Sequence, residues 1–243
     1  MFGKNEIRDD ETKLDGGVLA VQDIFETIQG EGPQQGRPCV FVRLAGCNLA
    51  CSFCDTEFES GINNRMSVDE ITYAVTSLQN YKLVVLTGGE PLRQNIIPLL
   101  TALGRNGVRV IQIETAGTLW VEGLEHFILG ARNSQVQLVC SPKTPKLHGM
   151  IERHTDHYKY VIEAGRTDAL DGLPAFGTQT RNLGLPQHIA RPKKLGFPQT
   201  IWVSPCDAHD AEQSKRNLQH TVDVAFKHGY RLSLQQHKIL GLP

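Results

Sequence analysis

Hydrophobic positions along the chain gather in short runs that are separated by polar and glycine-containing stretches. Short apolar runs bounded by turn residues are typical of strands that are buried on both faces. Seven segments follow this pattern and are predicted as strands: Val40–Leu44, Leu83–Leu86, Val108–Ile113, Val136–Cys140, Tyr158–Ile162, Thr200–Val203 and Arg231–Leu234.

Apolar residues recur at helical spacing in three of the remaining segments, which predicts helices over residues 68–78, 96–104 and 218–228. Ser67 and Glu70 have the spacing of a capping box, and Gly229 follows the last helical pattern as a C-terminal stop. Strands that alternate with helices predict an α/β fold with a parallel sheet, either doubly wound or curled into a full or partial barrel. In each case ligands bind at the carboxyl ends of the strands.

Composition and charge are those of an ordinary globular protein. Of the 243 residues, 40% are hydrophobic and 21% are charged, and 25 basic against 26 acidic side chains give a formal net charge of -1. This balance argues against a nucleic-acid partner, because such a partner requires a basic face. No apolar run is long enough to span a membrane, and the polar N-terminus lacks a signal-peptide stretch. We therefore predict a cytoplasmic protein without a membrane partner.

The chain length is compatible with one α/β domain. Residues 1–17 carry eight charged side chains and no apolar period, so we predict a flexible lead-in there. Residues 18–243 are predicted to form a single domain. Within it, residues 165–200 are rich in glycine and proline and are expected to form an inserted surface loop, as a lid or as a partner contact.

The cysteines point to a metal centre. The chain has six: Cys39, Cys47, Cys51, Cys54, Cys140 and Cys206. Cys47, Cys51 and Cys54 follow the first predicted strand with the spacing C-x3-C-x2-C. Thiolates held this closely can bind three corners of a cubane iron–sulfur cluster and leave one iron open for another ligand. A structural zinc site with Cys39 as fourth ligand is an alternative that the spacing alone does not exclude.

This cysteine loop resembles the radical S-adenosylmethionine (radical SAM) superfamily, in which the open iron of a 4Fe–4S cluster chelates S-adenosylmethionine. The segment Leu86-Thr-Gly-Gly-Glu-Pro91 follows the second predicted strand and resembles the GGEP motif of the same superfamily. The resemblance implies a partial, abbreviated TIM-like barrel of about six parallel strands with a reduced set of helices.

Further motifs narrow the resemblance to one family. They are Thr27-Ile-Gln-Gly-Glu-Gly32, Phe41-Val-Arg43, Cys54-Asp-Thr56, Ile113-Glu-Thr115, Ser141-Pro-Lys143, Ser204-Pro-Cys-Asp207 and Gln236-His-Lys-Ile-Leu-Gly-Leu-Pro243. In this order they resemble the 7-carboxy-7-deazaguanine synthase family. The resemblance implies a carbon–nitrogen lyase of queuosine and 7-deazapurine biosynthesis. Such an enzyme contracts the ring of 6-carboxy-5,6,7,8-tetrahydropterin to 7-carboxy-7-deazaguanine with loss of ammonia.

The same resemblance implies the cofactors and partners. They are one 4Fe–4S cluster, S-adenosylmethionine and Mg2+, with a homodimer and an electron donor of the flavodoxin type as partners. It assigns Cys47, Cys51 and Cys54 to the cluster and Thr56 to Mg2+. The residues that it assigns to the pterin substrate are Ile28, Gln29, Gly30, Arg43, Thr87, His237 and Pro243.

The residues that the resemblance assigns to S-adenosylmethionine lie in four segments. They are Phe53, Cys54, Asp55, Gly89, Ser141, Pro142, Lys143, Ser204, Pro205, Cys206 and Asp207. Ser204 stands where the family commonly has Gln, so mainly backbone contacts are expected from this position.

Residue chemistry adds four expectations. The period of two along the first predicted strand turns Arg43 away from the aliphatic face and into the site, where a guanidinium suits a carboxylate. Glu114 ends an apolar strand and is expected in the site. Lys159 has the same inward parity but is also compatible with a snorkelling side chain. Asp55 is an alternative ligand for Mg2+, because that ion prefers carboxylate oxygens.

Two other functions stay open at this point. One is a radical SAM activating enzyme that places a radical on another protein, as glycyl-radical activating enzymes do. The other is a non-catalytic metal-binding module, which would not cleave S-adenosylmethionine.

Overall fold

The fold is built on a single sheet. In a computed structural model of the chain, the described residues are 5–54, 56–130, 135–155, 157–179, 185–193 and 200–243. Within them, nine strands form one sheet in the order β3-β1-β2-β4-β5-β6-β7-β8-β9. The strands are β1 (Val18–Ile28), β2 (Pro38–Leu44), β3 (Arg65–Ser67), β4 (Leu83–Gly88), β5 (Val110–Thr115), β6 (Gln135–Cys140), β7 (His157–Ile162), β8 (Thr200–Pro205) and β9 (Arg231–Leu232).

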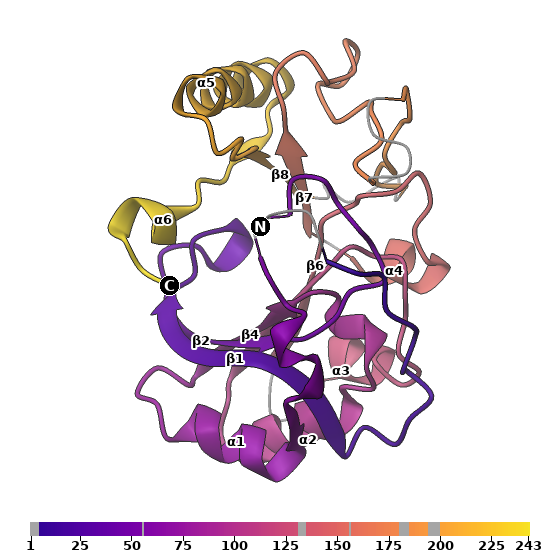
Figure 1. Ribbon diagram of the computed structural model, residues 1–243, viewed down its shortest axis with the longest axis vertical. Coiled ribbons are helices and arrows are strands. Elements are labelled where there is room, and N and C mark those ends of the chain that lie inside the picture. The colour runs from indigo at the N-terminus through magenta and orange to yellow at the C-terminus, as the bar shows by residue number, and fades with distance from the viewer. Residues whose placement is uncertain (1–4, 55, 131–134, 156, 180–184, 194–199) are drawn as a thin grey trace.

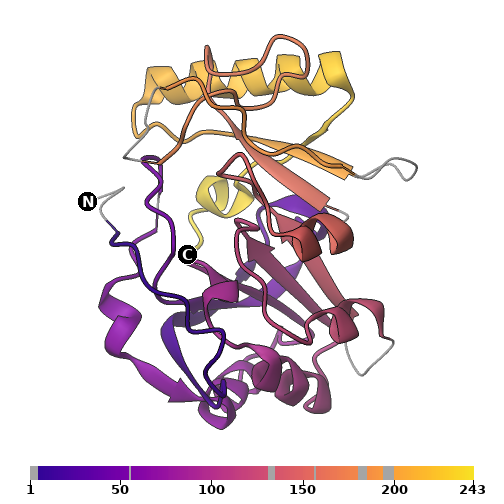
Figure 2. The ribbon, with the colours of Figure 1, turned by 90° about the vertical axis from the view of Figure 1, so that its right-hand side faces the viewer.

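The sheet has the topology of an opened barrel. From β2 to β9 each strand pairs in parallel with the next strand in the sheet, whereas β1 is antiparallel to both β2 and β3. Each parallel crossover therefore advances the sheet in the same direction, and β3 and β9 remain as open edges. Figures 1 and 2 show the sheet winding from β1 and β2 at one end to β7 and β8 at the other. The predicted partial barrel is confirmed.

Six helices and three 3-10 turns accompany this sheet within the described residues. They are α1 (Val68–Thr76), α2 (Ile97–Arg105), α3 (Glu125–Leu129), α4 (Gly149–His154), α5 (Ala211–His228) and α6 (Gln236–Leu240), with 3-10 turns η1 (Gly32–Gln34), η2 (Ser60–Asn63) and η3 (Pro91–Arg93). In Figure 1, α1, α2 and α3 lie together at one end and α5 lies at the other. Ser67 and Glu70 form the predicted capping box, and Gly229 ends α5 with a φ of 71°. The first two turns of α5 were not predicted, because they lack apolar residues at helical spacing.

The strand β1 was not predicted from the sequence either. Its hydrophobic residues are interrupted by polar ones, and its pairing with β2 shifts register between Val21 and Asp23. A strand whose exposed positions are polar and whose period is broken by a bulge gives neither a continuous apolar run nor a regular alternation.

Strand β2 separates the core from the interior of the barrel. Val40, Val42 and Leu44 are fully buried in the main core, which α1 and α2 cover with aliphatic side chains. The alternate residues Phe41 and Arg43 face a pocket on the other side. The predicted parity of Arg43 is thus present in the structure, and the inner face of the sheet carries the polar residues.

The N-terminal residues and the glycine- and proline-rich loop both differ from the expectation of free surface segments. Within residues 5–17, the amide of Arg8 donates to the Cys47 carbonyl oxygen at 2.7 Å, and that of Glu11 donates to the Arg93 carbonyl oxygen at 2.7 Å. In the described parts of 165–200, Leu173 and Ile189 are buried in the main core. Both segments therefore pack on the barrel.

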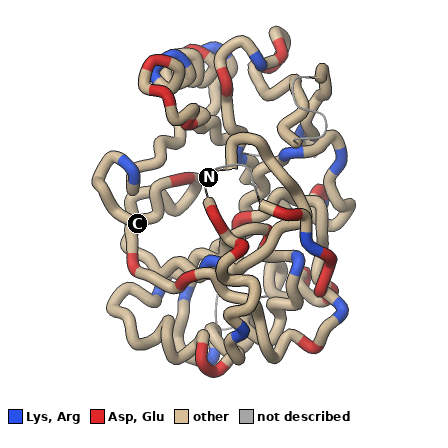
Figure 3. The backbone as a smooth tube through the Cα atoms, viewed as in Figure 1, with Lys and Arg blue, Asp and Glu red and all other residues tan. Residues whose placement is uncertain are grey.

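Basic and acidic residues are interspersed along the whole chain, as the blue and red segments of the backbone tube in Figure 3 show. None of the helices within the described residues is both long and apolar enough to cross a bilayer.

The buried carboxyl of Glu90 joins the turn after β4 to the end of β5. Its oxygens accept hydrogen bonds from Thr115 Oγ1 at 2.7 Å, the Ala116 amide at 2.8 Å and the Leu92 amide at 3.0 Å. Burial raises the pKa of Glu90, and these three donors oppose that rise. The carboxyl therefore satisfies three buried hydrogen-bond donors that have no access to water.

We expect Glu90→Gln to lower the free energy of unfolding by about 1–3 kcal/mol, because the amide would turn an N–H toward a buried donor. Urea denaturation of the variant and of the parent chain measures this difference. Glu122→Gln is the control, since Glu122 is exposed and a surface change costs less than about 0.5 kcal/mol. Equal stability of the two variants would contradict the proposed role of Glu90.

Candidate active site

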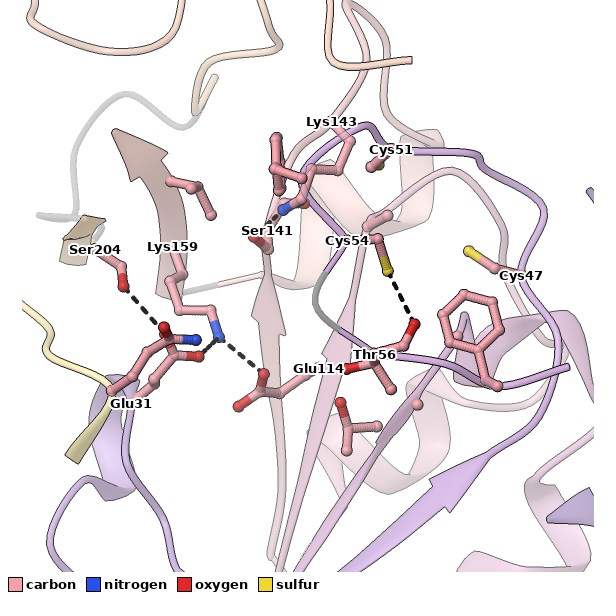
Figure 4. A pocket seen from close by; sticks show the side chains of 18 of the residues that line it. Glu31, Cys47, Cys51, Cys54, Thr56, Glu114, Ser141, Lys143, Lys159 and Ser204 are labelled. Atoms are coloured by element: carbon pink, nitrogen blue, oxygen red, sulfur yellow. Dashed lines mark hydrogen bonds and ion pairs between the residues drawn. The ribbon is translucent and has the colours of Figure 1, made fainter. Parts of the chain in front are cut away.

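A cavity of about 270 Å³ opens at the carboxyl ends of the parallel strands. Its walls come from the loop after β2, from the inner face of β2, β4, β5, β7 and β8, and from the C-terminal segment that contains α6. Figure 4 shows the cysteines on one side of this pocket and a group of charged side chains on the opposite side. The position agrees with the rule that parallel sheets bind ligands at their carboxyl edge.

The three clustered cysteines meet in the pocket wall. Cys47, Cys51 and Cys54 are free thiols and all line the cavity. Among the described residues, no group of three or more His, Cys, Asp or Glu side chains is arranged to hold a single metal ion. A structural zinc site would need such a compact set of ligands. Three thiols that line one cavity can instead serve as ligands of a cubane iron–sulfur cluster. Burial raises the pKa of the Cys47 thiol, and the charge of Glu90 adds to this effect.

Two glycines hold the start of the cysteine loop against the end of β4. The amide of Gly89 donates to the Leu44 carbonyl oxygen at 3.0 Å, and that of Glu90 donates to the Gly46 carbonyl oxygen at 3.0 Å. A Cβ at Gly88 would lie 2.0 Å from the Leu44 oxygen, and one at Gly89 would lie 2.0 Å from the Gly46 oxygen. Only glycine permits this backbone approach, so the GGE segment fixes where the thiols lie.

Lys159 is the centre of a buried charged group on the opposite wall. Its Nζ donates to Glu31 Oε2 at 2.5 Å and to Glu114 Oε2 at 2.9 Å, and Lys159 is only 6% exposed. Burial opposes the ammonium charge, but Glu114 and Glu31 outweigh it and raise the pKa of Lys159. Ser204 Oγ donates to Glu31 Oε1 at 3.1 Å, and Gln29 Nε2 donates to Glu114 Oε1 at 2.9 Å. The snorkelling interpretation of Lys159 is therefore wrong.

Arg43 and Thr87 lie side by side on the inner face of the sheet, because the parallel register pairs them across β2 and β4. The guanidinium carbon of Arg43 is 5.2 Å from the ring centroid of Phe25. No ion pair among the described residues involves Arg43. Its side chain therefore brings a positive charge to the pocket wall.

The C-terminal segment returns to the pocket. His237 and Pro243 both line the cavity, and Thr27 Oγ1 donates to the Pro243 oxygen at 3.0 Å. Lys238 Nζ lies 2.9 Å from Asp207 Oδ2, which holds α6 next to the end of β8. This Lys238 contact lowers the pKa of Asp207.

Lys143 connects the loop after β6 to the cysteine loop. Its Nζ donates to the Ser141 carbonyl oxygen at 3.0 Å and to the Ser141 hydroxyl, and it lies 5.9 Å from the ring centroid of Phe53. Burial lowers the pKa of Lys143. Three of the residues predicted to bind S-adenosylmethionine are thereby close together.

Most of the predicted site residues line this single cavity. These are Gln29, Arg43, Cys47, Cys51, Phe53, Cys54, Thr56, Thr87, Gly89, Ser141, Lys143, Ser204, Pro205, Cys206, Asp207, His237 and Pro243. Ile28, Gly30 and Pro142 do not line it; Ile28 ends β1, and Gly30 packs against α6. Asp55 lies outside the described residues.

Three further residues of the site were not predicted. Glu31 stands inside the quoted Thr27–Gly32 motif but received no role, because nothing in the sequence places it opposite Lys159. Asn5 and Gln179 contact the cysteine loop from two segments without apolar period. Such segments carry no periodic signal that could have located them.

The fold and the site define a radical SAM protein. The profile of the Radical SAM superfamily matches residues 42–165, which include the cysteine loop and the strands from β4 to β7. Membership of the superfamily implies a 4Fe–4S cluster and S-adenosylmethionine as cofactors.

Comparison with individual proteins is more specific. The chain is 44% identical to 7-carboxy-7-deazaguanine synthase of Rhodospirillum rubrum over 249 positions that cover 100% of both chains. It is 37% identical to the enzyme of the same name from Rickettsia prowazekii, covering 100% of this chain and 96% of that one. A crystal structure of QueE from Escherichia coli superposes with a TM-score of 0.63 over 93% of this chain and 99% of that one, at 22% identity, and supports the fold. The chain belongs to the 7-carboxy-7-deazaguanine synthase family, as its motifs predicted.

We expect five of the six cysteines to divide into two groups when each is changed to Ala and the protein is reconstituted anaerobically with iron and sulfide. Loss of Cys47, Cys51 or Cys54 removes one cluster ligand, so bound iron and the cluster absorbance should fall severalfold. Cys39→Ala and Cys140→Ala are the controls, since both thiols are fully buried away from the pocket. A full cluster in any of the three pocket variants would contradict the assignment.

Proposed function

We propose that the chain converts 6-carboxy-5,6,7,8-tetrahydropterin to 7-carboxy-7-deazaguanine with loss of ammonia, as a carbon–nitrogen lyase of 7-deazapurine and queuosine biosynthesis. The observation that carries this proposal is the pairing of two walls in one cavity. One wall presents three thiols for a cluster, and the opposite wall presents charged and polar groups for a polar substrate.

The wall next to the cysteine loop would hold the cofactors. Cys47, Cys51 and Cys54 would ligate three irons, and Lys143 would face the carboxylate of S-adenosylmethionine. The other contacts on this side would come from Phe53, Cys54, Asp55, Gly89, Ser141, Pro142, Ser204, Pro205, Cys206 and Asp207. Gly89 lines the cavity, and its lack of a side chain permits the close approach of its backbone to Gly46 at the start of the cysteine loop.

The opposite wall would bind the pterin. Arg43 has no carboxylate partner among the described residues and would pair with the substrate carboxylate through its planar fork. Glu31 and Glu114 are acceptors for the N–H groups of the pterin, and Lys159 holds both carboxylates in place through its contacts with them. The remaining contacts would come from Ile28, Gln29, Gly30, Thr87, His237 and Pro243.

When bound, the cluster and S-adenosylmethionine supply a 5′-deoxyadenosyl radical that takes a hydrogen atom from the substrate. The protein's share is to bind, orient and shield the reacting pterin. Glu114 and Glu31 hold its polar edge through fixed hydrogen bonds, and Lys159 prevents the two carboxylates from repelling each other. The C-terminal segment with His237 covers the pocket and limits access of water.

Several finer features belong to the same proposal. Mg2+ would be held by Thr56, which lines the pocket, together with substrate oxygens. The protein would act as a cytoplasmic homodimer, take electrons from a flavodoxin-type donor and fold as one radical SAM domain over residues 18–243. Three measurements test these features. Dependence of activity on added Mg2+ tests the metal, sedimentation of the purified protein tests the homodimer, and reduction by a flavodoxin tests the electron donor.

The decisive experiment is anaerobic reconstitution followed by incubation with S-adenosylmethionine, a reductant and the carboxytetrahydropterin. We expect 7-carboxy-7-deazaguanine and ammonia in equal amounts. An intact cluster that yields no such product would refute the proposal. Cleavage of S-adenosylmethionine without turnover of the pterin would favour a protein-activating enzyme, and no cleavage at all would favour a metal-binding module.

Lys159→Met should lower kcat/KM for the pterin by roughly 100-fold, or ~2.7 kcal/mol, because it leaves two half-buried carboxylates without their cation. Lys159→Arg restores the charge and should recover part of the loss. Lys227→Met on the exposed side of α5 is the control. Steady-state kinetics with intact cluster content measure the effect, and activity of Lys159→Met equal to that of the control would exclude this role.

Gly30→Ala should raise KM for the pterin about tenfold, or ~1.4 kcal/mol, because the added Cβ would lie 2.3 Å from His237 Nδ1 and 3.0 Å from the Gln236 amide. The clash displaces the segment that brings His237 to the pocket. Gly149→Ala is the matched control, since its Cβ meets nothing within 4 Å. The same KM in both variants would show that α6 need not dock on Gly30.

A further inference from the structure

Each of the three cluster thiols receives one N–H group. The Leu49 amide points to Cys47 Sγ at 3.4 Å. Gln179 Nε2 points to Cys51 Sγ at 3.1 Å, and Asn5 Nδ2 points to Cys54 Sγ at 3.5 Å. The last two donors are neutral side-chain amides that come from outside the cysteine loop, 128 and 49 residues away in the chain.

Gln179 is fixed in its donor position. It is only 4% exposed, and its Oε1 accepts from the Ala50 amide at 2.9 Å, which orients the amide group. The backbone around it pairs with the cysteine loop through a bridge between Cys51 and Gln179 and through the Ser52 amide, which donates to the Thr178 carbonyl oxygen at 2.9 Å. With its oxygen held by Ala50, the nitrogen is directed at Cys51.

Asn5 has a comparable arrangement on the other side of the loop. Its Nδ2 also donates to the Thr56 carbonyl oxygen at 2.8 Å, and its Oδ1 accepts from the Phe58 amide at 3.4 Å. The Cys54 thiol donates to the same Thr56 oxygen at 3.4 Å. When Cys54 loses its proton to bind iron, that donor disappears, and Asn5 can still serve both the carbonyl and the thiolate because its amide carries two N–H groups.

We propose that Gln179 and Asn5 raise the reduction potential of the cluster through N–H···S hydrogen bonds to Cys51 and Cys54. Reduction adds one negative charge to the cluster and its thiolates, and an N–H dipole aimed at sulfur stabilises the reduced state more than the oxidised one. Hydrogen bonds to the sulfurs are among the factors that set the potentials of iron–sulfur clusters. Both residues are positioning groups toward the cofactor and do not contact the substrate.

The proposal gives a chemical role to two segments that the catalytic assignment leaves unused. The N-terminal residues are fastened beside the cluster by the ion pair between Arg8 and Glu59, and by the bridge between Ile7 and Cys47. The glycine- and proline-rich loop reaches the cluster through Thr178 and Gln179. The role rests on the cluster alone, so it is tested without the pterin and stands apart from the identity of the substrate.

The test is a redox titration of the reconstituted full chain, followed by electron paramagnetic resonance without S-adenosylmethionine or pterin. Gln179→Leu and Asn5→Leu remove the donors without adding charge. Each should lower the ratio of reduced to oxidised cluster at a fixed potential by roughly three- to tenfold, where tenfold corresponds to about 59 mV for one electron. The double variant should show the sum of the two shifts, because the donors act on different thiolates.

Two controls separate this effect from loss of anchoring. Tyr160→Phe removes the hydroxyl that donates to the Ala190 carbonyl oxygen at 2.7 Å and so anchors the same loop, but it keeps Gln179 and its partners. Glu59→Gln weakens the hold on Arg8 but keeps Asn5. Both should titrate at the parent potential with full iron and sulfide content.

If Gln179→Leu and Asn5→Leu retain the cluster and its reduction potential equals that of the parent chain, the proposal is overturned. It is also overturned if the two control variants shift the potential as much as the Leu variants do. Loss of the cluster in both Leu variants, with retention in the controls, would also overturn it in favour of a role in assembling the site. If only one Leu variant retains its cluster, the reduction potential of that variant tests the role of the residue changed in it. At the position whose Leu variant loses the cluster, the milder change Gln179→Asn or Asn5→Gln moves the amide by one methylene. This variant must also lower the reduction potential of the cluster.

Discussion

The whole site depends on one close backbone contact, in which the turn after β4 lies directly on the end of β2. The amides of Gly89 and Glu90 donate to the carbonyl oxygens of Leu44 and Gly46. No side chain larger than a hydrogen fits at Gly88 or Gly89. The contact fixes the first residues of the cysteine loop relative to the parallel sheet. The carboxyl of Glu90 then extends it to the end of β5, so three strand ends are joined beneath the pocket.

Electrostatics divide the cavity into two chemical halves. The thiol side has neutral N–H donors, and burial raises the pKa of Cys47 on this side. The other side already contains compensated charge, since Lys159 neutralises much of the repulsion between Glu31 and Glu114. A polar substrate that enters the cavity can therefore replace its hydrogen bonds to water by hydrogen bonds to these fixed side chains, and it needs no counter-ion of its own. Such preorganised groups need little rearrangement during reaction.

Local patterns were sufficient to predict much of this arrangement. The apolar runs located β2 and β4 to β9, because strands buried on both faces leave continuous hydrophobic segments. Parity along β2 and β7 placed Arg43 and Lys159 on the inner face, and the end of an apolar strand placed Glu114 in the site. The cysteine spacing indicated the cluster. The missing parts are those without a local period. The broken alternation of β1, the ion pairs of Lys159, and the contacts of Asn5 and Gln179 all depend on residues far away in the chain.

These distances along the chain also constrain how the site comes into being. The hydrogen bond from Gln179 to the cysteine loop spans 128 residues, and that from Thr27 to Pro243 spans 216. Contacts of such long sequence separation close late in folding, because the entropy of large loops must be overcome first. The contact of Gln179 with Cys51 therefore requires a chain that extends at least to residue 179, and the wall at Pro243 requires residue 243. The complete site is thus a property of the whole folded sheet and not of the cysteine loop by itself.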